Sequence, residues 1–342
     1  MMDENKTKIL KTINKEDLGR WLSSLLKEYE VIAPVKESDG SVFFRVIKSE
    51  DEVCMDFSNT VLSPKEFFIP RSQTIFEFSG DDISTEGIDN KKRILFGVRP
   101  CDVNSLAILD EVYTGEICDP YYKARRENTL IISLGCNDPG DCCFCKPAGG
   151  SPYLCDSDIK LTDLGDKYLI ETGNGKNNIK ILNNTGIFKE ASGDDIKLGE
   201  LKAKQADDKF TGNFDLDKLN NIKKFNDKFL DEQVRKCIGC ALCTYICPTC
   251  TCFDVSDEAM ISQQKGRRVK SWDSCMLPSF TLLAGGENPR AKKSERFKQR
   301  IYHKFKYHLE NYGKIACVGC GRCIKKCPVN IDVRYVVDGA AG

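Results

Sequence analysis

Apolar positions in residues 1–50 follow a helical spacing and then a strand-like one. Four of them recur on one face of a predicted helix: Leu18, Trp21, Leu22 and Leu25. Asn14 precedes this run as a candidate helix cap. Two apolar runs follow, 29–34 and 41–48, and the dipeptide Asp39-Gly40 between them readily adopts the positive φ angles of a hairpin turn. The pattern predicts a helix and then a β-hairpin.

Two short, largely apolar runs further along predict buried strands. They span 93–98 and 129–134, and the helical pattern 103–112 lies between them. A crossover of this length favours parallel strands, whose carboxyl ends lie at one edge of the sheet. Cys101 and Cys136 follow those two ends, so we expect them to face one another. Open α/β sheets bind their ligands at this edge.

The later patterns change from strands to helices. Short β patterns occupy 156–182, and we interpret the polar, Lys/Asp-rich stretch 192–212 as a linker. Two helical stripes follow, the second between a cap at Ser294 and a stop at Gly313: Leu219, Ile222, Phe225, Phe229 and then Phe297, Ile301, Phe305, Leu309. A chain of 342 residues is long enough for two domains. We predict an α+β protein with an N-terminal α/β domain built on a mixed sheet, 1–205, followed by a mainly helical domain, 213–342.

The candidate chemistry of the helical domain lies in two cysteine quartets. Each follows the spacing C-x2-C-x2-C-x3-C-P: Cys237, Cys240, Cys243, Cys247 and Cys317, Cys320, Cys323, Cys327. This spacing is typical of ferredoxin-like domains with two [4Fe–4S] clusters, where the fourth cysteine of each run binds the other cluster. It predicts crossed sets, with Cys327 joining the first three cysteines of the first quartet and Cys247 those of the second. Four-thiolate zinc sites usually show two separated C-x2-C pairs, so zinc or disulfides are poorer alternatives.

Composition adds limits on compartment and partners. The chain has 19 cysteines, and 51 basic residues balance 51 acidic ones. The clustering of so many thiols suits a metal protein of a reducing compartment, and the charged N-terminus and the lack of a long apolar run lead us to expect a cytoplasmic protein with no membrane segment. The balanced charge gives no reason to expect a nucleic-acid partner.

Further cysteines leave alternatives open. Cys101, Cys136, Cys143 and Cys145 form a candidate third [4Fe–4S] site, with Cys142 as a spare, or a nest of buried thiols or a redox dithiol. Three more thiols lie between the quartets: Cys250, Cys252 and Cys275. These are further metal ligands or, in the favoured interpretation, thiols buried beside the clusters. The spacing alone does not decide which of these extra cysteines bind metal.

Other motifs give little support for catalysis by this chain. No strand is followed by a G-x-G-x-x-G or Walker motif, so nucleotide binding is unsupported. The only histidines, His303 and His308, lie in the basic run 292–306 or just after it, and we interpret that run and both histidines as a solvated helix face. A catalytic site based on histidine is therefore not expected.

These motifs, in this order, resemble the family of dicluster proteins that includes the sulfhydrogenase beta subunit and the corresponding iron–sulfur subunit of anaerobic sulfite reductase. The residues that carry the resemblance are the two quartets together with Arg99-Pro100-Cys101-Asp102, Gly135-Cys136, Cys143-Phe144-Cys145, Cys247-Pro248-Thr249-Cys250-Thr251-Cys252, Trp272-Asp273-Ser274-Cys275-Met276 and Ala284 to Arg290. The resemblance implies an electron-relay subunit between a flavoprotein NAD(P)H-dependent subunit and a terminal catalytic subunit. It also implies that the candidate third-cluster cysteines are functional. The ending Cys327-Pro328-Val329-Asn330-Ile331-Asp332 is more similar to the hydrogenase type than to the sulfite reductase type.

The leading hypothesis is therefore an iron–sulfur electron-transfer subunit of a multi-subunit oxidoreductase, with no catalytic residue of its own. A competing hypothesis is a self-contained reductase that binds flavin or substrate at the sheet edge beside Cys101 and Cys136. A third is a redox-sensing interaction module that has no obligate enzyme partner.

Overall fold

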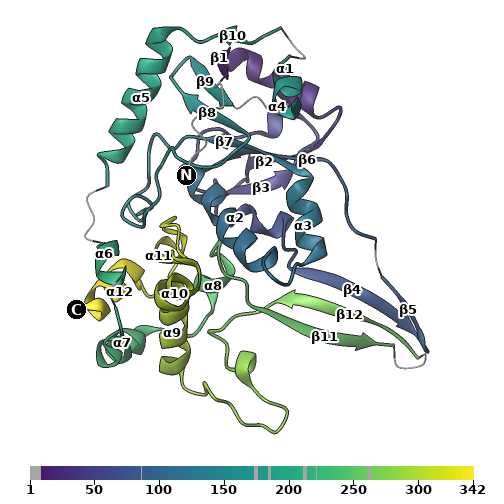
Figure 1. The fold of residues 1–342 in the computed structure, drawn as a ribbon, viewed down its shortest axis with the longest axis vertical. Coiled ribbons are helices and arrows are strands. Elements are labelled where there is room, and N and C mark those ends of the chain that lie inside the picture. Colours follow the sequence, from purple (N-terminus) through teal and green to yellow (C-terminus); the bar gives the residue numbers. More distant parts are fainter. Residues whose placement is uncertain are drawn as a thin grey trace.

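The computed structural model describes residues 9–85, 87–172, 176–183, 186–210, 214–220, 222–260 and 264–342. Its larger sheet has the strand order β10-β1-β9-β8-β7-β6-β2-β3 (Figure 1). The bounds of these strands are β1 (Ile9–Asn14), β2 (Glu30–Lys36), β3 (Val42–Val46), β6 (Arg93–Val98), β7 (Thr129–Leu134), β8 (Ile159–Asp163), β9 (Lys167–Thr172) and β10 (Lys189–Glu190). Strands β2, β6, β7 and β8 pair in parallel, whereas the outer pairs are antiparallel. The sheet is mixed, as predicted.

Helices lie on both faces of this sheet. Their bounds are α1 (Leu18–Leu25), α2 (Pro100–Tyr113), α3 (Pro120–Glu127), α4 (Lys176–Asn183) and α5 (Gly193–Asp207). Because successive side chains of a strand point to opposite faces, Phe96 packs with Trp21 of α1 in one hydrophobic core. Leu95 packs with Leu106 of α2 and Tyr122 of α3 in the other. Both faces of strand β6, which leads to Cys101, are therefore buried.

The N-terminal predictions are confirmed in part. The stripe on α1 is buried, and β2 and β3 form the predicted hairpin with Gly40 at a φ of 81°. The first element of the described residues is not a helix, however, because β1 precedes α1 and ends at Asn14. Asn14 makes no capping hydrogen bond through its side chain. The strand was missed because charged residues interrupt its short apolar run.

The predicted linker is wrong over most of its length. Residues 193–207 form α5, and Ser192 begins this helix with a capping box in which it and Asp195 exchange hydrogen bonds. The last two residues of the proposed linker, 211 and 212, lie outside the described residues. The β patterns at 156–182 are confirmed by β8 and β9, but 176–183 form α4, not a strand.

A smaller sheet joins sequence-distant halves of the chain. Its order is β11-β12-β4-β5, and its strands are β4 (Ser72–Ser79), β5 (Asp82–Ser84), β11 (Phe253–Ala259) and β12 (Lys265–Trp272). Strand β12 pairs antiparallel with β4, so a hairpin that lies between the cysteine quartets is bound to the N-terminal half (Figure 1). The two predicted domains thus share a sheet.

The C-terminal part is otherwise helical. Its helices are α6 (Leu216–Asn220), α7 (Asp227–Gln233), α8 (Leu242–Tyr245), α9 (Lys293–Tyr302), α10 (His308–Tyr312), α11 (Arg322–Lys325) and α12 (Val333–Ala341). Of the first predicted stripe, Leu219 lies in α6 and Phe229 in α7, whereas Ile222 and Phe225 lie between these helices and are not helical. All four residues pack in the C-terminal core. The second runs through α9, a π-helical turn (His303–Tyr307) and α10, and it ends at Gly313 with a φ of 72°. The residue before its first turn is Lys292, not Ser294. None of the described helices is long and apolar enough to cross a membrane.

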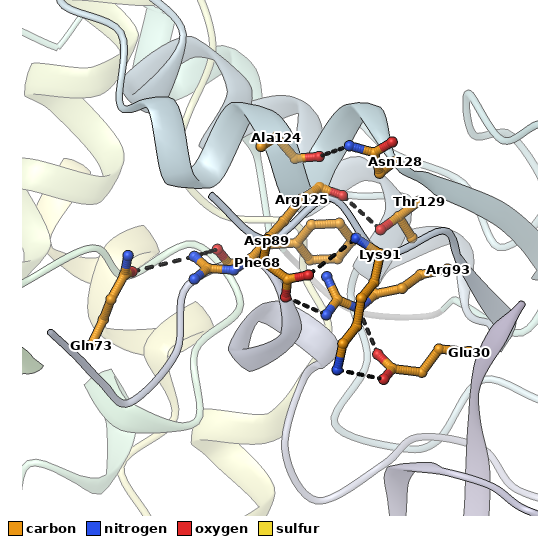
Figure 2. A network of polar contacts seen from close by, with 10 residues as sticks. All are labelled: Glu30, Phe68, Gln73, Asp89, Lys91, Arg93, Ala124, Arg125, Asn128 and Thr129. Carbon is orange, nitrogen blue, oxygen red and sulfur yellow. Dashed lines mark hydrogen bonds and ion pairs between the residues drawn. The ribbon is translucent and has the colours of Figure 1, made fainter. Parts of the chain in front are cut away.

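A polar network joins the amino ends of the parallel strands β2 and β6 (Figure 2). Arg93 of β6 donates to Glu30 of β2 at 2.7 Å and to Asp89 at 2.5 Å. Lys91 also donates to Glu30, at 3.3 Å. These partners, against the cost of partial burial, lower the pKa of both carboxyl groups. The network holds β2 and β6 in register, and their opposite, carboxyl ends face the cysteines.

Candidate iron–sulfur centres

The first quartet lies on a tight loop that ends in α8. Gly239 and Ala241 have φ angles of 73° and 60°, and these left-handed turns direct the chain back around Cys240. The backbone N–H of Gly239 donates to the sulfur of Cys237 at 3.4 Å. Cys240 is exposed, and the neighbouring Ile238 is 64% exposed. This loop therefore lies at the protein surface.

The second quartet repeats the same turn in a buried setting. Gly319 and Gly321 have φ angles of 61° and 74°, and α11 follows. A hydrogen bond to sulfur occurs here too, because the N–H of Ile331 donates to Cys327 at 3.2 Å. The glycines touch the N-terminal half of the chain. A Cβ atom on Gly319 would lie 2.4 Å from the carbonyl oxygen of Phe144, and one on Gly321 would lie 2.4 Å from that of Cys142.

The structure brings the eight cysteines together around two cavities, and each cavity draws on both quartets. The first cavity is lined by Cys237, Cys240, Cys243 and Cys327. The second cavity is lined by Cys247, Cys317, Cys320 and Cys323. Cys323 also lines the first cavity, so the two cavities share a wall. Each cavity thus has cysteines of both quartets in its lining, and the assignment of ligands to crossed sets stays a prediction.

Basic side chains of the long C-terminal helix border the cavities. Arg300 lines both cavities, and Lys304 lines the second. Burial alone would lower the pKa of each group, but nearby thiolates, chiefly Cys243 for Arg300 and Cys247 for Lys304, raise it overall. Buried Arg300 Nε has no hydrogen-bond partner among the described residues. A cation and an unpaired donor suit an anionic cluster whose sulfides accept hydrogen bonds, so the residues fit the predicted group.

This result corrects the interpretation of the basic run as a solvated face. Arg296, Arg300 and Lys304 are buried, as is His308, whereas His303 is exposed as predicted. The ring nitrogen Nδ1 of His308 lies 2.8 Å from the carbonyl oxygen of Lys314. The spacing of four between Arg296, Arg300 and Lys304 places them on one helix face, and this was the available signal. It was missed because a basic face is more often solvated.

The N-terminal half is fastened to the second quartet by polar contacts. Arg322, 3% exposed, forms two hydrogen bonds of 2.6 and 2.7 Å with the carboxylate of Asp102, which is fully buried. The same guanidinium donates to the carbonyl and the hydroxyl oxygens of Thr60. The N–H of Phe144 donates to Gly319 O at 2.7 Å, and Asn59 donates to Cys320 O at 2.8 Å. Sequence analysis missed Arg322 and Asp102 as partners because they lie 220 positions apart.

The candidate third-site cysteines gather at this junction. Burial, and then the neighbouring thiolates of Cys143 and Cys136, raise the pKa of Cys145 to about 12. Burial also raises the pKa of Cys101, with smaller contributions from Cys320 and Cys145. Cys101 therefore lies near both Cys145 of its own set and Cys320 of the second quartet. Cys142 lines a separate groove with Cys143 and Cys320. Nearby Arg99 donates to Gly135 O at 2.8 Å and leaves a buried Nε without a described partner.

The other thiols also lie beside the clusters' cavities. Cys250 contacts Cys247, and Cys252 contacts Cys275. Buried Lys65 donates to Cys250 O at 3.0 Å, and its amine lies 4.3 Å from the centroid of the Trp272 ring. Nothing in the sequence pointed to Lys65. Among the described residues, no group of three or more histidine, cysteine, aspartate or glutamate side chains is arranged to hold a single metal ion.

Comparison with known proteins agrees with this geometry. Residues 236–331, which include both quartets, match the family described as 4Fe-4S dicluster domain. Fold and site thus define an iron–sulfur, electron-transferring dicluster protein. The chain is 33% identical over 329 residues to sulfhydrogenase 2 subunit beta of Pyrococcus furiosus, covering 95% of this chain and 96% of that protein. The chain belongs to the sulfhydrogenase beta-subunit family, as the resemblance implied. No solved structure matches it.

Proposed function

We propose that this chain is the electron-relay subunit of a multi-subunit oxidoreductase, with one [4Fe–4S] cluster in each cavity. The observation that carries the proposal is the grouping of cysteines from both quartets around each cavity. Such clusters, when bound, supply one-electron redox chemistry. The chain's own residues bind them through thiolates, exclude water with an apolar lining and place Arg300 against both. No proton-transfer residue is required.

We assign the ligands in crossed sets. Cys237, Cys240, Cys243 and Cys327 hold the cluster of the first cavity, and Cys317, Cys320, Cys323 and Cys247 hold that of the second. The shared wall at Cys323 supports close approach of the two centres, which fast electron exchange requires. The buried cations Arg300 and Lys304 offset the negative charge that four thiolates bring into the core.

We assign a third [4Fe–4S] cluster to Cys101, Cys136, Cys143 and Cys145. Its support is the mutual proximity of these sulfurs and the packing of Phe144 on Gly319 of the second quartet. The order of stations is then the third site, the second cavity and the exposed first cavity. A row of clusters with its two ends apart suits a subunit that contacts one partner at each end. The Pyrococcus relative is named as a subunit, so that protein belongs to an assembly.

The partners we propose are a flavoprotein NAD(P)H-dependent subunit and a terminal catalytic subunit of the hydrogenase or sulfite reductase type. The hydrogenase type is favoured because the similar protein is named as a sulfhydrogenase subunit. We place the complex in the cytoplasm, since 19 cysteines with free thiols suit a reducing compartment. Purification of the native complex under anaerobic conditions tests the proposed partners. We expect one co-purifying chain that carries flavin and another that carries nickel or siroheme.

Paired substitutions test the crossed ligation. In the anaerobically purified chain, Cys247→Ser combined with Cys317→Ser should remove only one cluster, about four irons, because both residues serve the second cavity. Cys247→Ser combined with Cys237→Ser should remove two clusters, about eight irons. Iron analysis and electron paramagnetic resonance measure the difference. The reverse pattern would reject crossing, and zinc in place of iron would reject the function.

A second candidate function is a self-contained reductase, because a groove borders the sheet edge. This groove has a volume of about 730 Å³ and is lined by Cys142, Cys143, Cys320 and Arg322 among others. Ligand sites commonly have volumes of roughly 300 to 1,000 Å³. Flavin bound to the isolated, cluster-loaded chain would favour this candidate, and its absence from that chain but presence in the complex would favour the relay.

A further inference from the structure

Cys252 and Cys275 lie together at the base of the hairpin formed by β11 and β12. Phe253 pairs with Trp272 in the strand ladder, and one residue further out the N–H of Asp273 donates to Cys252 O at 3.0 Å. The chain then turns, so that both the thiol and the backbone N–H of Cys275 are directed at the sulfur of Cys252. Both residues are free thiols. The two thiols thus lie next to one another, as the partners of a disulfide must.

The turn that holds Cys275 is fixed against the first quartet. Ser274 is fully buried, its hydroxyl lies 2.6 Å from that of Thr244 in α8, and it accepts the N–H of Met276 at 3.0 Å. Cys275 itself is buried and packs in the same hydrophobic core as Cys243. The pair is therefore adjacent to the wall of the first cavity, and not a surface dithiol.

The surroundings of Cys252 favour a thiolate. The thiol of Cys275 donates to it, and with smaller contributions from Lys304 and Lys65 this lowers the pKa of Cys252 to about 6, against the opposing effect of burial. The hydrogen bond to Cys252 and burial together raise the pKa of Cys275. Cys252 is half-buried and Cys275 buried, so the more accessible sulfur is also the more acidic. This asymmetry is typical of redox-active dithiols, in which one thiolate attacks or is attacked.

We propose that Cys252 and Cys275 form a reversible dithiol–disulfide couple that exchanges electrons with the two clusters. The inference rests on the proposed function, because the clusters are its electron partners. On oxidation the two thiols lose two protons and two electrons, and the S–S bond forms. The two electrons would pass singly to the two oxidised clusters that the quartets would hold, and the protons would leave to solvent from the half-buried Cys252. Reduction reverses each step.

The consequence is that a couple that transfers two electrons lies beside clusters that each transfer one. NAD(P)H gives up its electrons as a pair in a hydride, whereas a cluster carries them singly. A dithiol–disulfide couple next to the first cavity would store or supply both electrons of such a pair.

Peptide mapping of the whole cluster-loaded chain tests the couple. The protein is poised anaerobically with ferricyanide or dithionite, free thiols are alkylated in denaturant, and peptides are identified by mass spectrometry. We expect a Cys252–Cys275 disulfide in the oxidised sample and two alkylated cysteines in the reduced one. Alkylation of both residues in the oxidised sample would overturn the proposal, without any need for a variant.

Reductive titration gives an independent measure. Cys275→Ser should take up about two electrons per chain fewer than the parent protein, because the couple transfers two. Cys155→Ser, which changes a half-buried thiol that contacts Ser133 and Ser157, is the matched control and should leave the uptake unchanged. Unchanged uptake in Cys275→Ser would reject the couple. Loss of about four irons from that variant would instead make Cys275 a cluster ligand and also reject it. These two outcomes differ from a failure of the proposed function, because in that case the parent protein itself would contain no iron.

Discussion

The two cysteine quartets share one spacing but lie in different surroundings. The position before the second cysteine is glycine in both, with φ angles of 73° at Gly239 and 61° at Gly319. A Cβ atom on Gly239 would meet nothing within 4 Å, whereas one on Gly319 would collide with Phe144. The position after that cysteine is Ala241 in the first quartet and Gly321 in the second, where the Cys142 carbonyl leaves no room.

The difference shows that the same motif serves two purposes. In the first quartet the turn only has to surround a cavity near the surface, so alanine is tolerated at a φ of 60° despite a strain of roughly 1 to 2 kcal/mol. In the second quartet the turn is also an interface. Its backbone packs on the loop 142–145, and Arg322 reaches Asp102 behind it. The second quartet therefore joins the two halves of the chain, and the first faces outward.

The largest expected effect comes from breaking the buried ion pair of the second quartet. Arg322→Met leaves the fully buried Asp102 carboxylate without its cation, which should lower the free energy of unfolding by about 3–5 kcal/mol. Anaerobic urea denaturation, followed by far-ultraviolet circular dichroism, measures the change.

The matched control is Leu242→Met, because Leu242 holds the position of Arg322 in the first quartet. A volume-conserving apolar exchange there should lower the free energy of unfolding by less than about 1.5 kcal/mol. Equal losses in the two variants would contradict the distinction between an interface turn and a surface turn.

Local pattern and spacing predicted much of this molecule. The apolar runs at β6 and β7, the hairpin of β2 and β3, and the buried stripes on α1 and α9 all follow from periodicity that neighbouring residues impose. The spacing of each quartet fixes which cysteines share a turn, and both quartets contribute to each cavity; the crossed ligation itself stays a prediction. In each case the determining interactions lie close together in the sequence.

What the sequence did not reveal depends on distant contacts. Arg300 and Lys304 are basic residues on a helix, and only the cavities opposite them distinguish a buried cation from a solvated one. The polar composition of α5 suggested a linker, because the helix packs on the sheet through a few residues such as Gly199. The pairing of β12 with β4 joins segments almost two hundred residues apart, and no local pattern encodes it.

A smaller change in the free energy of unfolding is expected from substitutions of the equivalent glycines Gly239 and Gly319. Gly319→Ala and Gly239→Ala introduce similar backbone strain at a positive φ, so this strain does not contribute to the difference in stability between the two variants. Only the first forces a methyl group into the backbone of Phe144, which should cost about 1–3 kcal/mol more. The same displacement should reduce the iron bound at the third site. Denaturation and iron analysis of both variants measure this, and equal stability with full iron in both would show that the loop 142–145 does not need the glycine.

The smallest effect concerns the charges beside the two cavities. Lys304 is buried at the second cavity and donates to Thr249 and to Ala316 O, whereas Lys326 at the first cavity is exposed. Lys304→Met removes a cation that favours the more negative, reduced cluster, so the midpoint potential there should fall by on the order of 60 mV, a tenfold change for a one-electron couple. Lys326→Met should change the potential at the first cavity much less, because water screens an exposed charge. Redox titration followed by electron paramagnetic resonance measures both shifts; equal shifts would mean that burial does not separate the two centres, and the contrast between the quartets would then be one of packing alone.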